Sequence, residues 1–115
     1  MNKAQRAELQ TEVVDKITSL IGRLEDSDYT ILEEIKTTLS AVEGVTSAMA
    51  DQEREKFENM SEGLQNSESG QKLEEAADKL DNLCWPDAPE ELDDDSSEVL
   101  MAELQEVLTE VEELL

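Results

Sequence analysis

Histidine is absent from the 115-residue sequence, and with it the commonest general base and the usual metal ligand of proteins. Its absence also excludes every Ser-His or Cys-His nucleophilic pair. There is no glycine-rich phosphate loop, because Gly63 and Gly70 lie too far apart and lack the lysine that such a loop needs. We therefore expect a protein that is not an enzyme and that uses no cofactor and no metal ion.

Cysteine occurs once, as Cys84, so no internal disulfide can form, which fits a reducing compartment. No apolar run approaches the length of a membrane span, and the first residues lack the apolar segment of a secretion signal. We expect a cytoplasmic protein. Because Cys84 stands beside Trp85 at a predicted helix end, we expect it to form a hydrophobic plug over the bundle.

Aromatic residues are scarce, and the apolar residues are mainly Leu, Val, Ile, Ala and Met. That mixture favours helix seams over a β-sandwich or barrel. A chain of this length is one domain at most and buries little core by itself. Contact with copies of itself or with a target would supply the missing burial.

Apolar residues recur at helical spacing in four segments, which predict helices at about 4–25, 28–60, 69–84 and 97–115. Candidate N-caps precede three of them: Ser27 or Asp28, Ser67 or Ser69, and Ser96 or Ser97. Residues 85–96 form an acidic connector, where proline ends the third helix. The predicted fold is all-α, an elongated helical bundle or coiled-coil-like hairpin of about four helices in a single domain, residues 1–115.

The second predicted helix is too long to be covered by one neighbour of about sixteen residues. We therefore expect a homodimer formed through this helix. Glu53 places a charge on its apolar seam, so we expect that end of the helix to be wetter or to meet a partner there. Gly44 lies inside the helix at a cost of about 1 kcal/mol relative to alanine.

The charge is strongly acidic and uneven. The 31 acidic and 9 basic residues give a net charge of −22, and residues 80–115 hold 13 acidic residues and no basic one. Such a field repels nucleic acid and anionic membranes and attracts cationic surfaces. The alternative is that the acidity only keeps the protein soluble.

The last predicted helix carries glutamates at spacings of three, four and three: Glu103, Glu106, Glu110 and Glu113. They share one stripe, with neighbouring Cβ atoms about 5–6 Å apart, and are candidate partner-binding residues together with Asp93, Asp94 and Asp95. The alternative is an ordinary solvent-exposed face. The run from Asp87 to Glu98 does not predict a calcium loop, because its third and sixth positions are Pro89 and Leu92.

Residues 50–80 contain the step Phe57-Glu58-Asn59-Met60, followed by Glu62-Gly63-Leu64-Gln65-Asn66-Ser67 and then by Gly70, Glu75 and Ala76. With these residues the segment resembles a group of short bacteriophage and prophage proteins of unassigned function. In that group a long charged helix ends in an aromatic-Asn-hydrophobic step, followed by a Pro-Glu-x-Leu-Gln-x-Ser-like turn and a small acidic helix. Ser61 stands where the group often has proline. The resemblance implies a phage origin and helix-turn-helix-like packing, and it implies no catalytic activity. The residues that match the pattern are Asn59, Leu64, Gln65, Ser67, Gly70, Glu75 and Ala76.

Three functions are consistent with these features. The first is a phage-encoded inhibitor that binds a basic, nucleic-acid-binding host protein, with carboxylates imitating phosphates; this rests on analogy of composition and source. The second is a structural or accessory oligomerisation module whose acidity only maintains solubility. The third is a regulatory partner of a polymerase subunit. We expect no direct binding of nucleic acid or membrane in any of the three.

Overall fold

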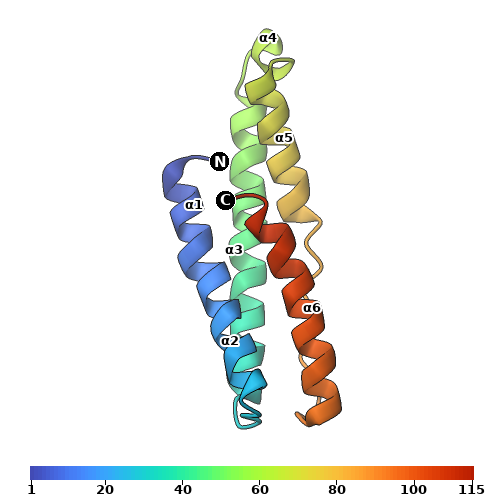
Figure 1. Ribbon diagram of the computed structural model, residues 1–115. Coiled ribbons are helices and arrows are strands. Elements are labelled where there is room, and N and C mark those ends of the chain that lie inside the picture. Colours follow the sequence, from blue (N-terminus) through green and yellow to red (C-terminus); the bar gives the residue numbers. More distant parts are fainter.

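The computed structural model describes residues 1–115 as an all-helical rod without strands, which measures 53 × 21 × 19 Å (Figure 1). The predicted all-α class and elongated shape are confirmed. None of its helices is both long enough and apolar enough to cross a bilayer.

The N-terminal arm is one continuous rod of three segments, α1 (Lys3–Leu9), the π-helical η1 (Gln10–Val14) and α2 (Asp15–Glu25). Asn2 caps α1, accepting the backbone N–H of Gln5 while the Gln5 side chain accepts the N–H of Asn2. The π turn inserts one extra residue, so that Val13 and Val14 are both buried. The sequence pattern predicted this arm as a plain helix, and its bounds are confirmed to within one residue.

The turn after α2 differs from the prediction. Ser27 adopts a left-handed backbone with a φ of 59°, and the N–H groups of Ser27 and Asp28 bond back to the carbonyls of Leu24 and Arg23. This is the Schellman pattern that closes a helix C-terminus. Neither Ser27 nor Asp28 caps the next helix, which begins only at Leu32, and the Asp28 carboxylate instead accepts the backbone N–H of Thr30 at 3.1 Å.

The long helix α3 (Leu32–Glu58) therefore begins four residues later than predicted, without a side-chain cap. The middle of its seam, from Ile35 to Glu53, is buried, whereas Leu32 and Phe57 near its two ends are half-buried. The buried seam residues are Ile35, Leu39, Val42, Thr46, Met49, Ala50 and Glu53.

We expected the Glu53 end of the helix to be wetter or to meet a partner there. The Glu53 side chain itself is shielded from water, because it is 0% exposed, whereas Phe57 beyond it is only half-buried. Lys56 Nζ and the amino group of Met1 lie 3.1 and 3.2 Å from the carboxylate oxygens of Glu53, which provides the charge that burial demands.

The chain then reverses through a single turn of helix, α4 (Glu62–Gln65), and returns along α3 as α5 (Glu68–Asp81). Ser67 caps α5, as predicted, although the turn between the helices was expected to be a loop throughout. Gly70 is buried in this turn. A Cβ built there would lie 2.4 Å from the carbonyl oxygen of Leu64, so the two short segments meet backbone to backbone.

Residues 82–93 run as an extended strap over the lower part of α3. Pro86 and Pro89 keep it out of a helix, and Trp85 packs on the core with its indole N–H donating to Thr46 Oγ1 at 3.2 Å. Cys84 is exposed, so the plug is formed by Trp85 and not by the thiol as expected.

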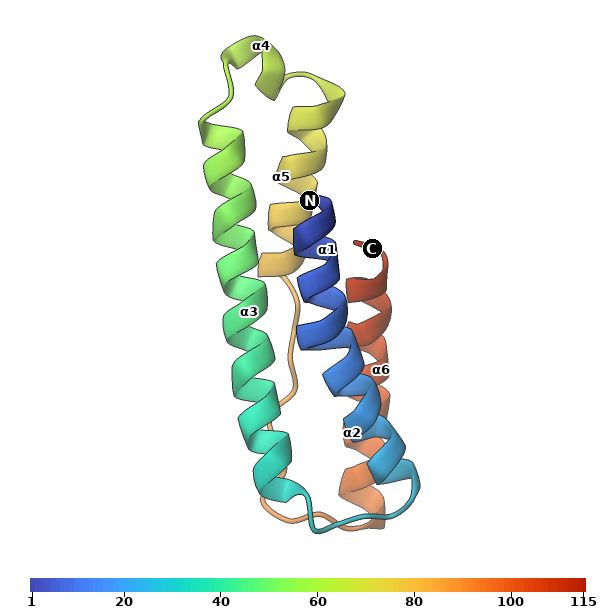
Figure 2. The same ribbon diagram turned by 90° about the vertical axis from the view of Figure 1, so that its left-hand side faces the viewer.

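The last helix, α6 (Asp94–Glu112), begins three residues before its predicted start. Its N-cap is Asp93, which accepts the backbone N–H of Ser96 while Ser96 Oγ accepts the N–H of Asp93. Ser96 is thus the second member of the capping box, and neither serine is the cap. Figure 2 shows α6 climbing beside α2, whereas the hairpin of α3, α4 and α5 extends beyond the end of α6.

Candidate protein-binding surface

The glutamates of α6 face solvent. Glu103, Glu106, Glu110 and Glu113 are all exposed, on the side of the helix away from the core. The opposite side is fixed by burial against the N-terminal arm, because α6 packs on α2 and η1. Because α6 has 3.6 residues per turn, the glutamate stripe is directed outward when the apolar side is buried. The buried residues of α6 are Ser97, Leu100, Leu104, Val107 and Val111.

The acidic face of α6 is almost free of compensating cations. Among the ion pairs of the molecule, the pair of Glu113 with Lys79 of α5 is the only one that involves the glutamate stripe. Glu103, Glu106 and Glu110 form no ion pair and no side-chain hydrogen bond. Elsewhere basic residues neutralise their neighbours, as Lys16 does with Glu12 at 2.7 Å.

The three candidate aspartates divide by role. Asp93 is the N-cap, and the backbone N–H of Ser96 holds the pKa of Asp93 below its ordinary value of 3.8. Asp94 accepts a hydrogen bond from the Tyr29 hydroxyl, and this bond raises the pKa of Tyr29. Both aspartates therefore hold the start of α6 in place. Asp95 is exposed and forms no such bond, so it is the one free to meet a partner.

The structure joins Asp95 to the glutamate stripe around a hollow that the sequence pattern did not predict. Val99 lies between Asp95 and Glu103, one helical turn from each, and is 58% exposed, the most exposed large apolar side chain of the chain. The hollow has a volume of about 340 Å³. The only feature of the sequence that could have indicated it is that Val99 directly precedes Leu100, a residue of the apolar face of α6. Its lining residues are Asp87, Pro89, Asp95, Ser96, Val99, Leu100 and Glu103.

This arrangement suits a basic protein surface. A lysine or arginine can lay its aliphatic stem on Val99 and keep its charged end among Asp95 and Glu103. The stripe itself contains no histidine, thiol or convergent polar pair, and no group of three or more Asp, Glu, Cys or His side chains is arranged to hold a metal ion. What it offers is charge and a small apolar anchor.

Comparisons with models of protein families, with curated proteins and with solved structures found no match to this chain. The resemblance of residues 50–80 to short phage proteins stays a prediction.

Proposed function

We propose that this chain binds a basic, nucleic-acid-binding protein through the solvent face of α6 and blocks its nucleic-acid site. The observation that carries the proposal is the line of unpaired carboxylates from Asp95 to Glu110, on a segment of 36 residues that holds no basic residue. Solvent-exposed faces ordinarily mix both signs. A surface of one sign that is left uncompensated is suited to attracting and holding a cationic partner.

The spacing of the stripe points to the kind of surface that it imitates. From Glu103 to Glu110, the unpaired part of the stripe, the helix rises about 10 Å, at about 1.5 Å per residue. A single nucleic-acid strand carries about three phosphates over that length, at about 3.4 Å each, whereas a duplex carries about six. The three unpaired glutamates therefore approximate the charge density along one strand. The proposed target is a protein whose cationic cleft follows one strand of the backbone.

The phage resemblance and the acidity together favour a bacterial defence or nucleic-acid-processing protein as the target, met in the host cytoplasm. The proposed mechanism is exclusion: the acidic helix occupies the cleft, and the nucleic acid cannot enter. Catalysis has no part in it, and neither has direct contact between this chain and DNA or RNA, because like charges repel.

The test compares two variants that lose the same charge. In the first, Glu103, Glu106, Glu110 and Glu113 are replaced by glutamine, which keeps size and helix propensity. In the matched control, four exposed glutamates scattered over the other helices are replaced in the same way: Glu8, Glu25, Glu43 and Glu58. Both variants carry four negative charges fewer. The stripe variant also loses the ion pair of Glu113 with Lys79, so the helicity and the urea unfolding of both variants are compared before their binding.

The measurement is capture of proteins from a nuclease-treated bacterial lysate on the immobilised chain, with elution by single-stranded DNA. Wild type and control should retain the same basic proteins, release them to DNA, and bind them more weakly as salt rises. The stripe variant should retain them at least tenfold less. If the stripe variant, shown to be helical, retains them as wild type does, the stripe is not the binding surface.

An accessory module is the second candidate function. It is favoured by a half-exposed groove with an apolar floor on the hairpin, which meets the α6 stripe only at Glu113. Such a module should recover copies of itself or virion proteins in the same experiment, and single-stranded DNA should not elute them.

A further inference from the structure

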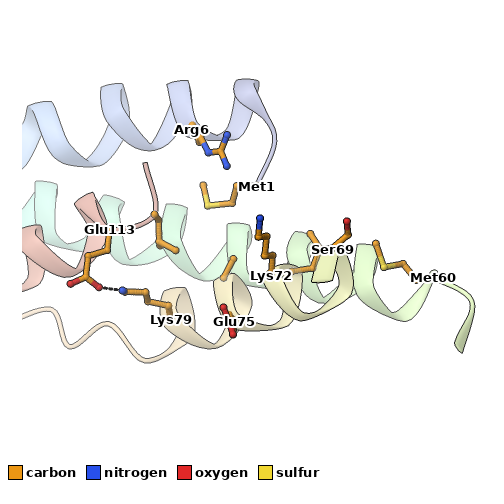
Figure 3. Close-up of a pocket in the computed structure, with 11 residues that line it drawn as sticks. Met1, Arg6, Met60, Ser69, Lys72, Glu75, Lys79 and Glu113 are labelled. Atoms are coloured by element: carbon orange, nitrogen blue, oxygen red, sulfur yellow. Dashed lines mark hydrogen bonds and ion pairs between the residues drawn. The ribbon is translucent and has the colours of Figure 1, made fainter. Parts of the chain in front are cut away.

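A second surface lies where the hairpin of α3, α4 and α5 leaves the rest of the rod. Figure 3 shows a groove bounded by the start of α1, by α5 and by the residues that follow α6. It has a volume of about 480 Å³ and is open to solvent. Its lining is Met1, Arg6, Met60, Ser69, Lys72, Leu73, Glu75, Ala76, Lys79, Glu113 and Leu114.

The floor of the groove is apolar because the bundle is incomplete there. In both ribbon views the hairpin continues past the start of α1 and the end of α6 (Figures 1 and 2). Below that level, the seam of α3 is covered by the N-terminal arm and by the strap of residues 82–93. Above it, Met60 and Leu73 remain only half-buried, although they continue the apolar stripes of α3 and α5. A further helical surface laid in the groove would complete their burial.

The walls of the groove differ in charge from the rest of the molecule. Arg6, Lys72 and Lys79 line it, which is three of the nine basic residues of the chain, together with the carboxylates of Glu75 and Glu113. Arg6 forms no ion pair, and Figure 3 shows its side chain and that of Lys72 directed into the space between α1 and α5. The groove is thus a face of mixed sign on a molecule of net charge −22.

We propose that the occupant of this groove is a second copy of the chain, packed through the same face about a two-fold axis. A two-fold interface brings a patch against itself, so the patch must be self-complementary. A face with an apolar floor and both signs of charge meets that condition, whereas the uniformly acidic face of α6 would repel its copy. The groove has 11 lining residues, fewer than the roughly 20–30 residues a side of stable interfaces, so the dimer should be weak and dissociate at about micromolar concentration.

The strength of this dimer and the strength of partner binding should change in opposite directions as the salt concentration rises. Two particles of charge −22 repel each other over the whole surface, and the few ion pairs in the groove are local. Added salt screens the long-range repulsion first, so self-association should strengthen as salt rises. Binding of a cationic target to α6 should weaken over the same range, so each proposal can fail without the other.

A matched pair of charge reversals tests the position of the interface. Lys72 and Lys16 each pair with a glutamate four residues earlier, and each is exposed. Lys72→Glu and Lys16→Glu therefore change net charge equally, but only Lys72 lines the groove. By sedimentation equilibrium in roughly 0.5 M salt, where long-range repulsion is screened, Lys72→Glu should weaken the dimer at least tenfold and Lys16→Glu at most twofold.

The four methionines supply a readout that needs no substitution. Met1 and Met60 line the groove, whereas Met49 is buried in the core and Met101 lies on α6. In spectra of methyl-labelled methionine, dilution should move the signals of Met1 and Met60 and leave those of Met49 and Met101 in place. A chain that stays monomeric at millimolar concentration in the same high salt, or a dimer that Lys72→Glu leaves intact, overturns the proposal and leaves the groove to a different occupant.

Discussion

Ser27 holds the only left-handed backbone conformation of the chain, with a φ of 59°, and no glycine adopts one. A side chain in this region costs about 1–2 kcal/mol, and glycine avoids that cost but loses more entropy on folding. We therefore expect Ser27→Gly to stabilise the protein by about 0.5–1 kcal/mol, measured by urea unfolding. A destabilised variant would show that the serine side chain contributes more to this turn than its backbone strain costs.

Two glycines on neighbouring elements should respond to alanine in opposite directions. At Gly44, inside α3, no atom lies within 4 Å of the position that an added methyl group would occupy, so Gly44→Ala should stabilise the helix by about 0.5–1 kcal/mol. At Gly70 the methyl would meet backbone atoms at 2.4–2.7 Å, which cannot give way cheaply. Gly70→Ala should cost about 1–3 kcal/mol and loosen the α4–α5 turn. Urea unfolding of both variants checks the signs, and equal shifts would contradict the close approach at Gly70.

At the scale of elements, the strap of residues 82–93 takes the place of a fourth helix beside the lower part of α3. Its attachment is the Trp85 indole bonded to Thr46 Oγ1, whose hydroxyl donates in turn to the Val42 carbonyl at 2.9 Å. Trp85→Phe keeps most of the packing and removes the bond, so it should cost about 0.5–1.5 kcal/mol. Thr46→Val leaves the indole N–H without its partner and should cost about 1–3 kcal/mol.

The double variant separates the bond from the packing. If the two groups act together, the combined cost in urea unfolding followed by circular dichroism should be smaller than the sum of the single costs by about 0.5 kcal/mol or more. Strict additivity would show that Trp85 holds the strap by packing alone.

The elements that the sequence predicted well are those set by local periodicity. The apolar stripes located all four long helical segments, and the same periodicity turned Glu103, Glu106 and Glu110 to solvent. The sequence pattern does not indicate the π turn, because the spacing of Leu9, Val13 and Ile17 remains that of an α-helix. The start of α6 was misplaced because Asp93 and Ser96 are both capping residues, and only the structure shows which accepts the first bond.

Features that depend on contacts distant in sequence could not be predicted in this way. Glu53 is buried because folding brings Met1 beside it, and Glu113 is neutralised by Lys79 from another helix. The groove forms because α1 begins, and α6 ends, part of the way along α5. Local patterns specify the faces of each helix, but they do not specify where neighbouring helices stop.

At the scale of the whole molecule, the stability of the fold depends on pH through the exposed carboxylates and through one fully buried carboxylate, that of Glu53. Burial alone raises the pKa of Glu53, but the Lys56 hydrogen bond and the amino group of Met1 outweigh it and hold that pKa below its ordinary 4.5. A lowered folded pKa means that the stabilising contribution is present above about pH 4.5 and is lost as pH falls through the folded value. Protonation of the exposed carboxylates acts in the opposite direction by reducing repulsion.

Comparison with Glu53→Gln isolates the buried group, because the exposed carboxylates titrate alike in both proteins. Near pH 7 the variant should be less stable by about 1–3 kcal/mol, since the charged hydrogen bonds are lost. The difference should shrink steadily from pH 4.5 downward, as wild type loses the same interaction by protonation. Urea unfolding of both proteins across about pH 3–7 measures it. A difference that stays constant over that range would mean that Glu53 is already protonated at neutral pH, and that its contacts with Lys56 and Met1 do not stabilise a charge.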